Sequence, residues 1–460
     1  MRATSLLRTL LCQKHTKVTG FEFTGSGLVA DVAPTTRLPR CGSCGRKVRQ
    51  GYDGRERRWR HLDFAGMRVE LCYRIRRVDC PRCGVQTELV PWAEPGSSFT
   101  RDFEDVVALL AQKTDKTTIC ELMGIAWETV GNIARRVLER RGPSDLLDGL
   151  TRIGIDEISY KRHHHYLTIV TDHDRRRVVW VGVGRSKETL SNFFTALGKE
   201  RAAKLELVSL DMLQSYIEMT REHAPQATLV FDRFHLQRLA QDAVDKVRRE
   251  QVREQRGTEE GKALKKTRFA LLKRPWNVNV EERRKLADVQ RQNRKLYRAY
   301  LLKETLCDIL DRRQPNVAQD LLVDWMAWAQ RSRLEPFRKL GKTIARHLDG
   351  IVEYVRTRLS NGIAEGMNSK IRTATKQAYG FRDSSSLTAM IYLRCSGVVI
   401  PPIRHYPRAF SAREERSASA HRKGSTLGSW IRGSEGQVVI SLGQQERAPD
   451  GEAVASQGAA

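Results

Sequence analysis

Two Cys-x-x-Cys pairs constrain the fold of this chain more than any other feature of its sequence. Cys41 and Cys44 form one pair, Cys80 and Cys83 form the other, and 35 residues separate the two pairs. Four thiolates with this spacing are typical of a closed tetrahedral zinc site, which requires the two pairs to meet in space. We therefore expect residues 1–100 to form a zinc-binding domain with a basic hairpin between the pairs. The alternative is that the four cysteines are unrelated free thiols.

The charge of the chain favours a polyanionic partner. It has 81 lysines and arginines against 54 acidic residues, which gives a formal charge of +27 and a pI near 10.0. Such a balance is typical of proteins that bind nucleic acid. Residues 1–100 hold 18 of the basic and 9 of the acidic side chains, so we expect this part to contact DNA or RNA; a solvated basic face is the alternative. Because no run of about 18 apolar residues is present, we expect no membrane span and a cytoplasmic, nucleoid-associated protein.

Residues 101–142 contain three short stretches with helical periodicity, at 102–112, 118–123 and 127–140, with a turn at Gly124. This pattern predicts a helix-turn-helix DNA-binding domain, although a plain three-helix packing unit is the alternative. The last helix would present one face to DNA and pack the other inward. The expected DNA-facing residues are Trp127, Asn132, Arg135 and Arg136, and the inward ones are Val130, Ile133 and Val137.

From residue 150 onward the periodicity changes from helix to strand. Strand-like runs occur at 151–155, 166–171, 177–182, 205–210 and 228–231, and helix-like runs occur at 187–197 and 214–223. This order predicts a mixed α/β sheet formed by residues 150–236. An aspartate follows three of the strands, at Asp156, Asp211 and Asp232.

The predicted sheet domain is interrupted. Between 237 and 355 the strand signals vanish and long charged helical segments take over, which predicts an all-α insertion. Its Trp276, Trp325 and Trp328 could stack on bases, but we interpret them as core because aromatics at helical spacing usually pack inside. Residues 356–398 would then complete the sheet domain, and the polar residues 405–460 would form a disordered tail.

Three carboxylates are candidates for a metal-dependent site that cuts DNA. Asp156 and Asp211 would lie side by side if their strands are neighbours, and Glu365 would close the site from a late amphipathic helix. Carboxylate oxygens select Mg²⁺ or Mn²⁺, and two such ions meet the needs of phosphodiester hydrolysis. Arg372 and Lys376 share the helix stripe of Glu365, so we expect them to lie along the DNA backbone.

A set of motifs runs through the chain from about residue 10 to residue 400. They are the double Cys-x-x-Cys, the helix-turn-helix, Gly154-Ile-Asp156-Glu157, Ser209-Leu-Asp211-Met, Phe231-Asp-Arg-Phe-His235, Asn361-Gly-Ile-Ala-Glu365-Gly-Met-Asn368, and Ala378-Tyr-Gly-Phe381. Together they resemble the ISL-three family of bacterial insertion-sequence transposases. The resemblance implies a multidomain α/β protein, with a ribonuclease-H-like catalytic domain that carries an Asp-Asp-Glu triad and an all-α insertion before its last helix.

Matched motif by motif, the resemblance assigns the triad to Asp156, Asp211 and Glu365. Asp232 is the competing second acid, and it would support the site or replace Asp211. We prefer Asp211 because the second acid of such domains follows the fourth strand. His235 would contact DNA or support the site, with a purely structural role as the alternative. Glu157 should face the other side of its strand and bind no metal.

The resemblance also implies a function. We expect a DNA transposase that binds the terminal inverted repeats of its insertion sequence and catalyses metal-dependent strand cleavage and strand transfer. Because two ends must be held together, a homodimer or higher oligomer on double-stranded DNA is expected. The alternative is a sequence-specific DNA-binding protein, either a regulator or an inactive transposase, and a generic nuclease is a third possibility.

Overall fold

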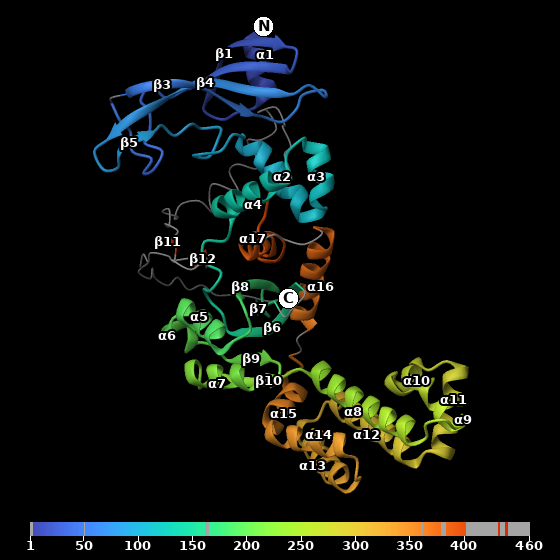
Figure 1. Cartoon of the computed structure of the whole chain (residues 1–460). Helices are drawn as coiled ribbons and strands as arrows, with labels where there is room; N and C mark the ends of the chain where they lie inside the picture. Colours follow the sequence, from blue (N-terminus) through green and yellow to red (C-terminus); the bar gives the residue numbers. More distant parts are fainter. Residues whose placement is uncertain are drawn as a thin grey trace, which may run out of the picture. The chain divides into compact units, whose positions relative to one another are not determined.

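The computed structural model divides the chain into two compact units, whose elements are drawn in Figure 1. It describes residues 3–49, 51–161, 165–359, 362–378, 383–401, 431–432 and 438–439. One unit combines Met1–Leu146 with Phe381–Ala460, and the other is Leu147–Gly380. The tail expected at 405–460 lies outside the described residues, except for an antiparallel pair of two-residue strands, β11 (Ile431–Arg432) and β12 (Val438–Val439).

A short helix and a five-stranded sheet open the first unit. Their bounds are α1 (Ala3–Leu11), β1 (Thr16–Thr24), β2 (Gly27–Pro34), β3 (Gly51–Arg60), β4 (Val69–Cys80) and β5 (Gly84–Thr87). The strand order is β1-β2-β4-β3, and β5 also pairs with β4. The antiparallel pair β3–β4 is the hairpin that the sequence predicts between the cysteine pairs. Trp59 and Trp92 pack edge to face in the core of this sheet, and each is 1 % exposed.

Three helices follow in the first unit. They are α2 (Arg101–Lys113), α3 (Lys116–Met123) and α4 (Trp127–Arg141), each within two residues of its predicted bounds. Gly124 ends α3 with a φ of 58°, a left-handed conformation that glycine adopts without strain. Val130, Ile133 and Val137 are fully buried, as the helical periodicity predicts.

A late helix joins this unit and alters one expected boundary. We expected residues 356–398 to complete the sheet domain, but α17 (Ser384–Cys395) packs against α2 and α4. Gln112 Nε2 donates to the Leu393 carbonyl at 2.8 Å, and Arg394 Nε donates to the Ala111 carbonyl at 2.7 Å. Residues 389–393 are all buried, so α17 has no amphipathic stripe from which its partners could be predicted.

A mixed sheet of five strands forms the centre of the second unit. The strands are β6 (Arg152–Lys161), β7 (His165–Asp172), β8 (Arg177–Val183), β9 (Leu207–Leu210) and β10 (Thr228–Phe231), accompanied by α5 (Lys187–Leu197), α6 (Lys199–Ala202) and α7 (Gln214–His223). Their order is β10-β9-β6-β7-β8. The strands β6, β9 and β10 run parallel, whereas β7 is antiparallel to both β6 and β8. The predicted mixed α/β sheet is confirmed.

Strand β6 is longer than the sequence predicts. We expected it to end at residue 155, but it continues to Lys161 because β7 pairs with it over residues 153–161. Strand β9 pairs only with residues 152–155. Asp156 therefore stands inside a strand, at the level where β6 loses its neighbour on the β9 side.

The segment between the sheet and the last helix of this unit is helical wherever the structure describes an element. It contains α8 (Arg233–Glu254), α9 (Glu259–Lys265), α10 (Arg268–Leu272), the 3-10 turn η1 (Pro275–Asn277), α11 (Val280–Gln292), α12 (Arg294–Asp311), α13 (Pro315–Arg331), α14 (Glu335–Arg346) and α15 (Leu348–Thr357), and α16 (Gly362–Gln377) follows it. Helices α8 and α12 lie side by side, with α9, α10 and α11 gathered at one end (Figure 1). Within the described residues, no helix combines the length and the apolar character needed to cross a membrane.

The three tryptophans of the insertion have different environments. Trp325 is 2 % exposed and donates from Nε1 to the Leu302 carbonyl at 2.8 Å, which agrees with the core interpretation. Trp328 is half-buried. Trp276 is 68 % exposed, so its interpretation as core is wrong.

Candidate active site

Three aspartates stand at the same level on three neighbouring parallel strands. The registers of β6 with β9 and of β9 with β10 align the residues that follow the paired segments, namely Asp156, Asp211 and Asp232. Because the carboxyl ends of parallel strands meet at one edge of a sheet, these side chains gather there. The structure thus brings together the two aspartates that the sequence assigns to the site and the aspartate that competes with them.

A fourth carboxylate comes from helix α16, which packs against β6 and β7. It is Glu365, and it lines the same open pocket of about 830 Å³ as the three aspartates. Arg185, Arg238 and Arg372 also line this pocket. The pocket therefore combines oxygen ligands suited to a hard divalent cation with guanidinium groups suited to phosphate.

Asp156 is a half-buried acid whose carboxylate accepts two hydrogen bonds. Its Oδ1 accepts the backbone N–H of Glu157 at 2.7 Å, and its Oδ2 accepts a hydrogen bond from Asn368 Nδ2, also at 2.7 Å. Burial, followed by the negative charge of Asp211, raises the pKa of Asp156 to about 7. The carboxylate is thus held in place by two donors while its ionised form is disfavoured.

Glu365 experiences the same repulsion from a more exposed position. Burial raises its pKa, and the charges of Asp232 and Asp211 raise it further. Acids that raise one another's pKa in this way are the donor set that a divalent cation would stabilise. Within the described residues, three or more ligand atoms approach to within 4.8 Å of one another only at the four cysteines, so the acids of the pocket form a more open group.

His235 is attached to one of the site aspartates. Its Nδ1 lies 3.2 Å from Asp211 Oδ2, and this hydrogen bond raises the pKa of the imidazole. The ring also lines the pocket. This position agrees with a role for His235 in supporting the site, which is one of the roles that the sequence suggested.

Glu157 lies nearer to the site than strand alternation suggests. We expected it to face the opposite side of β6, yet it lines the same pocket as Asp156. Burial raises the pKa of Glu157, and its side chain is hydrogen-bonded to Tyr216. That bond directs the carboxylate toward Tyr216. Glu157 therefore lines the pocket, but its side chain shares none of the hydrogen bonds of the Asp156 carboxylate.

Asn368 is a site residue that the sequence analysis missed as a functional candidate. It is 3 % exposed, lies one turn after Glu365 on α16, and donates to Asp156. Its Oδ1 is buried and has no hydrogen-bond partner within the described part of the chain. The signal was available, because Asn368 is part of the motif that carries Glu365 and lies three residues after it, on the neighbouring face of the helix.

Replacing Asn368 with alanine should weaken the site without unfolding the chain. Partners that orient a metal-binding carboxylate typically contribute about 10- to 100-fold to metal affinity or activity, and we expect a loss of that size in Mg²⁺-dependent DNA cleavage. The measurement is the cleavage rate as a function of Mg²⁺ concentration. Lys370→Ala, on the exposed side of the same helix, is the matched control. Equal rates for the two variants would assign Asn368 a packing role only.

The four cysteines of the first unit form a separate cluster. The Sγ atoms of Cys41, Cys44, Cys80 and Cys83 all lie within 4.8 Å of one another. Each second cysteine is followed by a glycine in the left-handed region, Gly45 at φ 68° and Gly84 at φ 67°. These turns allow the two pairs to converge, and four converging thiols are the ligand set of a structural zinc ion.

The residues predicted to face DNA from α4 separate into two groups. Asn132 and Arg135 are exposed and hydrogen-bonded to each other, so they remain available at the surface. Arg136 is instead bound to Glu104, whose side chain is fully buried, with Nε 2.6 Å from Oε1. Trp127 is half-buried, with Lys116 Nζ 4.2 Å from its ring centroid.

The predicted DNA contacts on α16 also differ from each other. Arg372 lines the acidic pocket, where its positive charge acts on Glu365. Lys376 is exposed one turn further along the helix and is not part of the pocket lining. The helix stripe identified in the sequence therefore extends from the pocket onto the surface.

Comparison with known protein families agrees with this arrangement. Residues 153–391 match a family model described as a transposase, and residues 88–138 match the helix-turn-helix domain of transposase family ISL3. Residues 37–83 match the zinc-finger of transposases IS204, IS1001, IS1096 and IS1165. The chain belongs to transposase family ISL3. The resemblance to the ISL-three family is confirmed.

Relatives of this ISL3 family member extend over most of its length. A transposase for insertion sequence element IS1557 from Mycobacterium tuberculosis is 39 % identical over 432 residues, which cover 86 % of this chain and 96 % of that protein. A transposase for insertion sequence element IS1001 from Bordetella parapertussis is 27 % identical over 362 residues, covering 78 % of this chain and 89 % of that protein. In this ISL3 chain the zinc-finger match contains all four cysteines, which supports a structural zinc ion.

Proposed function

We propose that this ISL3 chain binds the terminal inverted repeats of its own insertion sequence and catalyses metal-dependent cleavage and strand transfer there. The observation that carries the proposal is the group formed by Asp156, Asp211 and Glu365 in one pocket with cationic side chains. A DNA-binding regulator would not require such a group. Asp232, at the equivalent level of β10, is the alternative or supporting second acid.

The topology supports a ribonuclease-H-like catalytic domain. Strand β6 is central, the antiparallel strands β7 and β8 lie on one side, and the parallel strands β9 and β10 lie on the other. The all-α segment from α8 to α15 precedes α16, the helix that carries Glu365. This is the order that the family resemblance implies, with the insertion before the last helix of the domain.

The carboxylates of Asp156, Asp211 and Glu365 would hold two Mg²⁺ or Mn²⁺ ions, which would supply an activated water and neutralise charge on the phosphate. Asn368 and His235 would orient Asp156 and Asp211 through the hydrogen bonds described above. The pocket arginines would bind the phosphates on either side of the scissile bond.

Residues of α4 and α16 outside the acidic group would bind the DNA. Asn132 and Arg135 on α4 would contact the duplex, with Arg372 and Lys376 following the backbone near the site, while Arg136 and Trp127 mainly stabilise the helices. Because a transposition reaction joins two ends, we propose that the protein acts as a homodimer or a higher oligomer. Action on chromosomal DNA would take place at the bacterial nucleoid.

The function can be tested with the full chain and a DNA duplex that ends in the inverted repeat of its element. With Mg²⁺ we expect cleavage at the element end, and we expect Asp156→Asn and Glu365→Gln to lower its rate by at least about a thousandfold, since the metal ions supply several kcal/mol. Glu335→Gln, at an exposed carboxylate of α14, should leave the rate unchanged. Binding of ends without cleavage would indicate a DNA-binding protein alone, and equal cleavage of a scrambled end would indicate a generic nuclease.

A further inference from the structure

Trp276 has an exposed ring that contacts the guanidinium group of Arg274. The Arg274 guanidinium lies 4.4 Å from the ring centroid, while 68 % of the tryptophan remains open to solvent. Arg274 itself is anchored by Glu304, Asp308 and Asp311, at 2.9, 2.7 and 3.1 Å. The three ion pairs fix the position of Arg274, and its cation–π contact with Trp276 stabilises the ring. Most of the ring surface stays exposed.

The ring belongs to a part of the insertion that we name the insertion tip and define as α9, α10, η1 and α11. Lys273 Nζ lies 2.6 Å from Glu282 Oε1 and thereby joins the segment before Trp276 to the first turn of α11. A capping box between Asn279 and Glu282 starts that helix. Trp276 is thus exposed in a turn that the Lys273–Glu282 ion pair and the capping box of α11 stabilise.

A second aromatic is exposed on the insertion tip. Phe269 of α10 is 68 % exposed, and the Arg268 guanidinium lies 6.0 Å from its ring centroid. Exposed large aromatics beside arginines are typical of surfaces on which nucleic-acid bases stack. Single apolar residues scattered over a surface need no functional explanation. Here two exposed rings lie in one short segment and each has an arginine partner, which favours a functional role.

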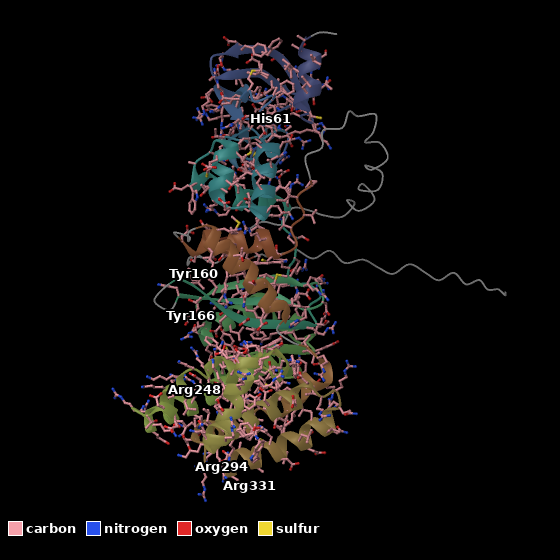
Figure 2. All side chains as sticks on the ribbon, turned by 90° about the vertical axis from the view of Figure 1, so that its right-hand side faces the viewer. His61, Tyr160, Tyr166, Arg248, Arg294 and Arg331 are labelled. Carbon is pink, nitrogen blue, oxygen red and sulfur yellow. The ribbon has the colours of Figure 1, made fainter. Side chains whose placement is uncertain are left out.

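The charge of the insertion tip identifies the kind of partner. Residues 259–292, which span the insertion tip, contain ten lysines and arginines and five acidic residues. The side chains of Lys265, Arg283, Arg284 and, at the start of α12 just after the tip, Arg294 are exposed and make no ion pair or hydrogen bond within the described residues. Arg294 lies at the end of the helical insertion away from the strands of Tyr160 and Tyr166 (Figure 2). A second copy of this strongly basic chain would be repelled there, whereas DNA would be attracted.

We propose that the insertion tip binds DNA that contains an unpaired base, with the base stacked on Trp276 and the phosphates held by Arg283 and Arg284. Stacking requires an accessible base face, and in a duplex the faces of internal bases are covered by their neighbours. The preferred ligand is therefore DNA with a splayed or single-stranded segment. The proposal adds a further DNA contact to those of the proposed function and does not depend on catalysis.

The proposal can be tested by fluorescence anisotropy with the full, zinc-loaded chain in the absence of added Mg²⁺ and Mn²⁺. One probe is a labelled duplex of random sequence, and the other is the same duplex with three unpaired nucleotides at its centre. Trp276→Ala should weaken binding of the unpaired probe by about tenfold, the effect of losing one stacked base, and should change binding of the paired probe little. Trp276→Phe should restore most of the affinity, because it restores an aromatic face. The double variant Arg283→Ala, Arg284→Ala should weaken the binding of both probes and lower the salt dependence of that binding.

Two controls separate this site from others. Val280→Ala alters an equally exposed side chain of the insertion tip that has no aromatic face, and it should bind both probes like the wild type. Asp156→Asn should also keep the preference for unpaired DNA, so loss of cleavage would not be mistaken for loss of this contact. Unchanged affinity of Trp276→Ala for the unpaired probe would overturn the proposal. A shift of that variant from dimer to monomer in sedimentation, with DNA binding unchanged, would also overturn it and assign the surface to a second copy.

Discussion

Replacing Cys80 with serine should unfold the region around the cysteine cluster and leave the second unit folded. The cluster is supported by a very small core, in which the buried apolar neighbours of the cysteines are Val48 and Val78. A core of this size cannot offset the entropy of ordering the segments around it. Binding of a structural zinc ion contributes about 10–16 kcal/mol in comparable sites, so its loss should dominate every other contribution in this region.

The measurement is zinc content by mass spectrometry, together with limited proteolysis of the purified chain. We expect Cys80→Ser to lose the metal and to become sensitive to protease between residues 37 and 88. Cys72→Ser is the matched control, because Cys72 is buried on the same strand but lies outside the cluster. A Cys80→Ser protein that kept one zinc ion per chain and its protease resistance would show that the cluster does not depend on the thiolate of Cys80.

Replacing Asp156 with asparagine should have opposite effects on activity and on stability. It removes a proposed metal ligand, so cleavage should be lost. It also removes a carboxyl whose pKa is raised from 3.8 to about 7 in the folded chain. Below pH 3.8 both states hold the proton, and between pH 3.8 and 7 only the folded state does, so wild-type stability falls as pH rises through this window. Above pH 7 the loss is complete.

Asparagine does not titrate, so the variant should escape this loss. Its stability advantage should be small near pH 4 and should grow to about 2–4 kcal/mol at pH 8, since each pKa unit corresponds to about 1.4 kcal/mol. Thermal unfolding of both proteins across this pH range measures it. Mg²⁺ should raise the Tm of the wild type at pH 8 and leave that of Asp156→Asn unchanged. Asp320→Asn, at an exposed position of α13, is the control, and a stability difference that did not vary with pH would contradict the assignment.

Local elements of this fold were predictable from short-range patterns. The helices at 187–197 and 214–223 and the strand at 228–231 agree with the structure at both ends, because each is a clear periodic run between turn residues. The cysteine cluster and the neighbouring positions of Asp156 and Asp211 were also predictable, since ligand spacing and strand order determine them.

The differences arise where distant segments meet. The length of β6 depends on its pairing with β7, and the state of Arg136 depends on the buried carboxylate of Glu104 on another helix. The exposure of Trp276 depends on three acids near the end of α12 that hold its arginine partner. None of these contacts leaves a periodic trace in the sequence, so propensity and spacing could not predict them.

The position of α17 has a consequence for how the protein is made. The three helices that include α4 are synthesised early, but the helix that packs against α2 and α4 is translated only after α16 and its proposed catalytic glutamate. A nascent chain therefore cannot complete its helix-turn-helix unit before the ribosome has passed α16 and the whole mixed sheet. A product truncated before residue 384 would carry the cysteine cluster and the proposed DNA-facing residues on an uncovered core. We expect such fragments to be degraded rather than to compete with intact protein for the ends of the element.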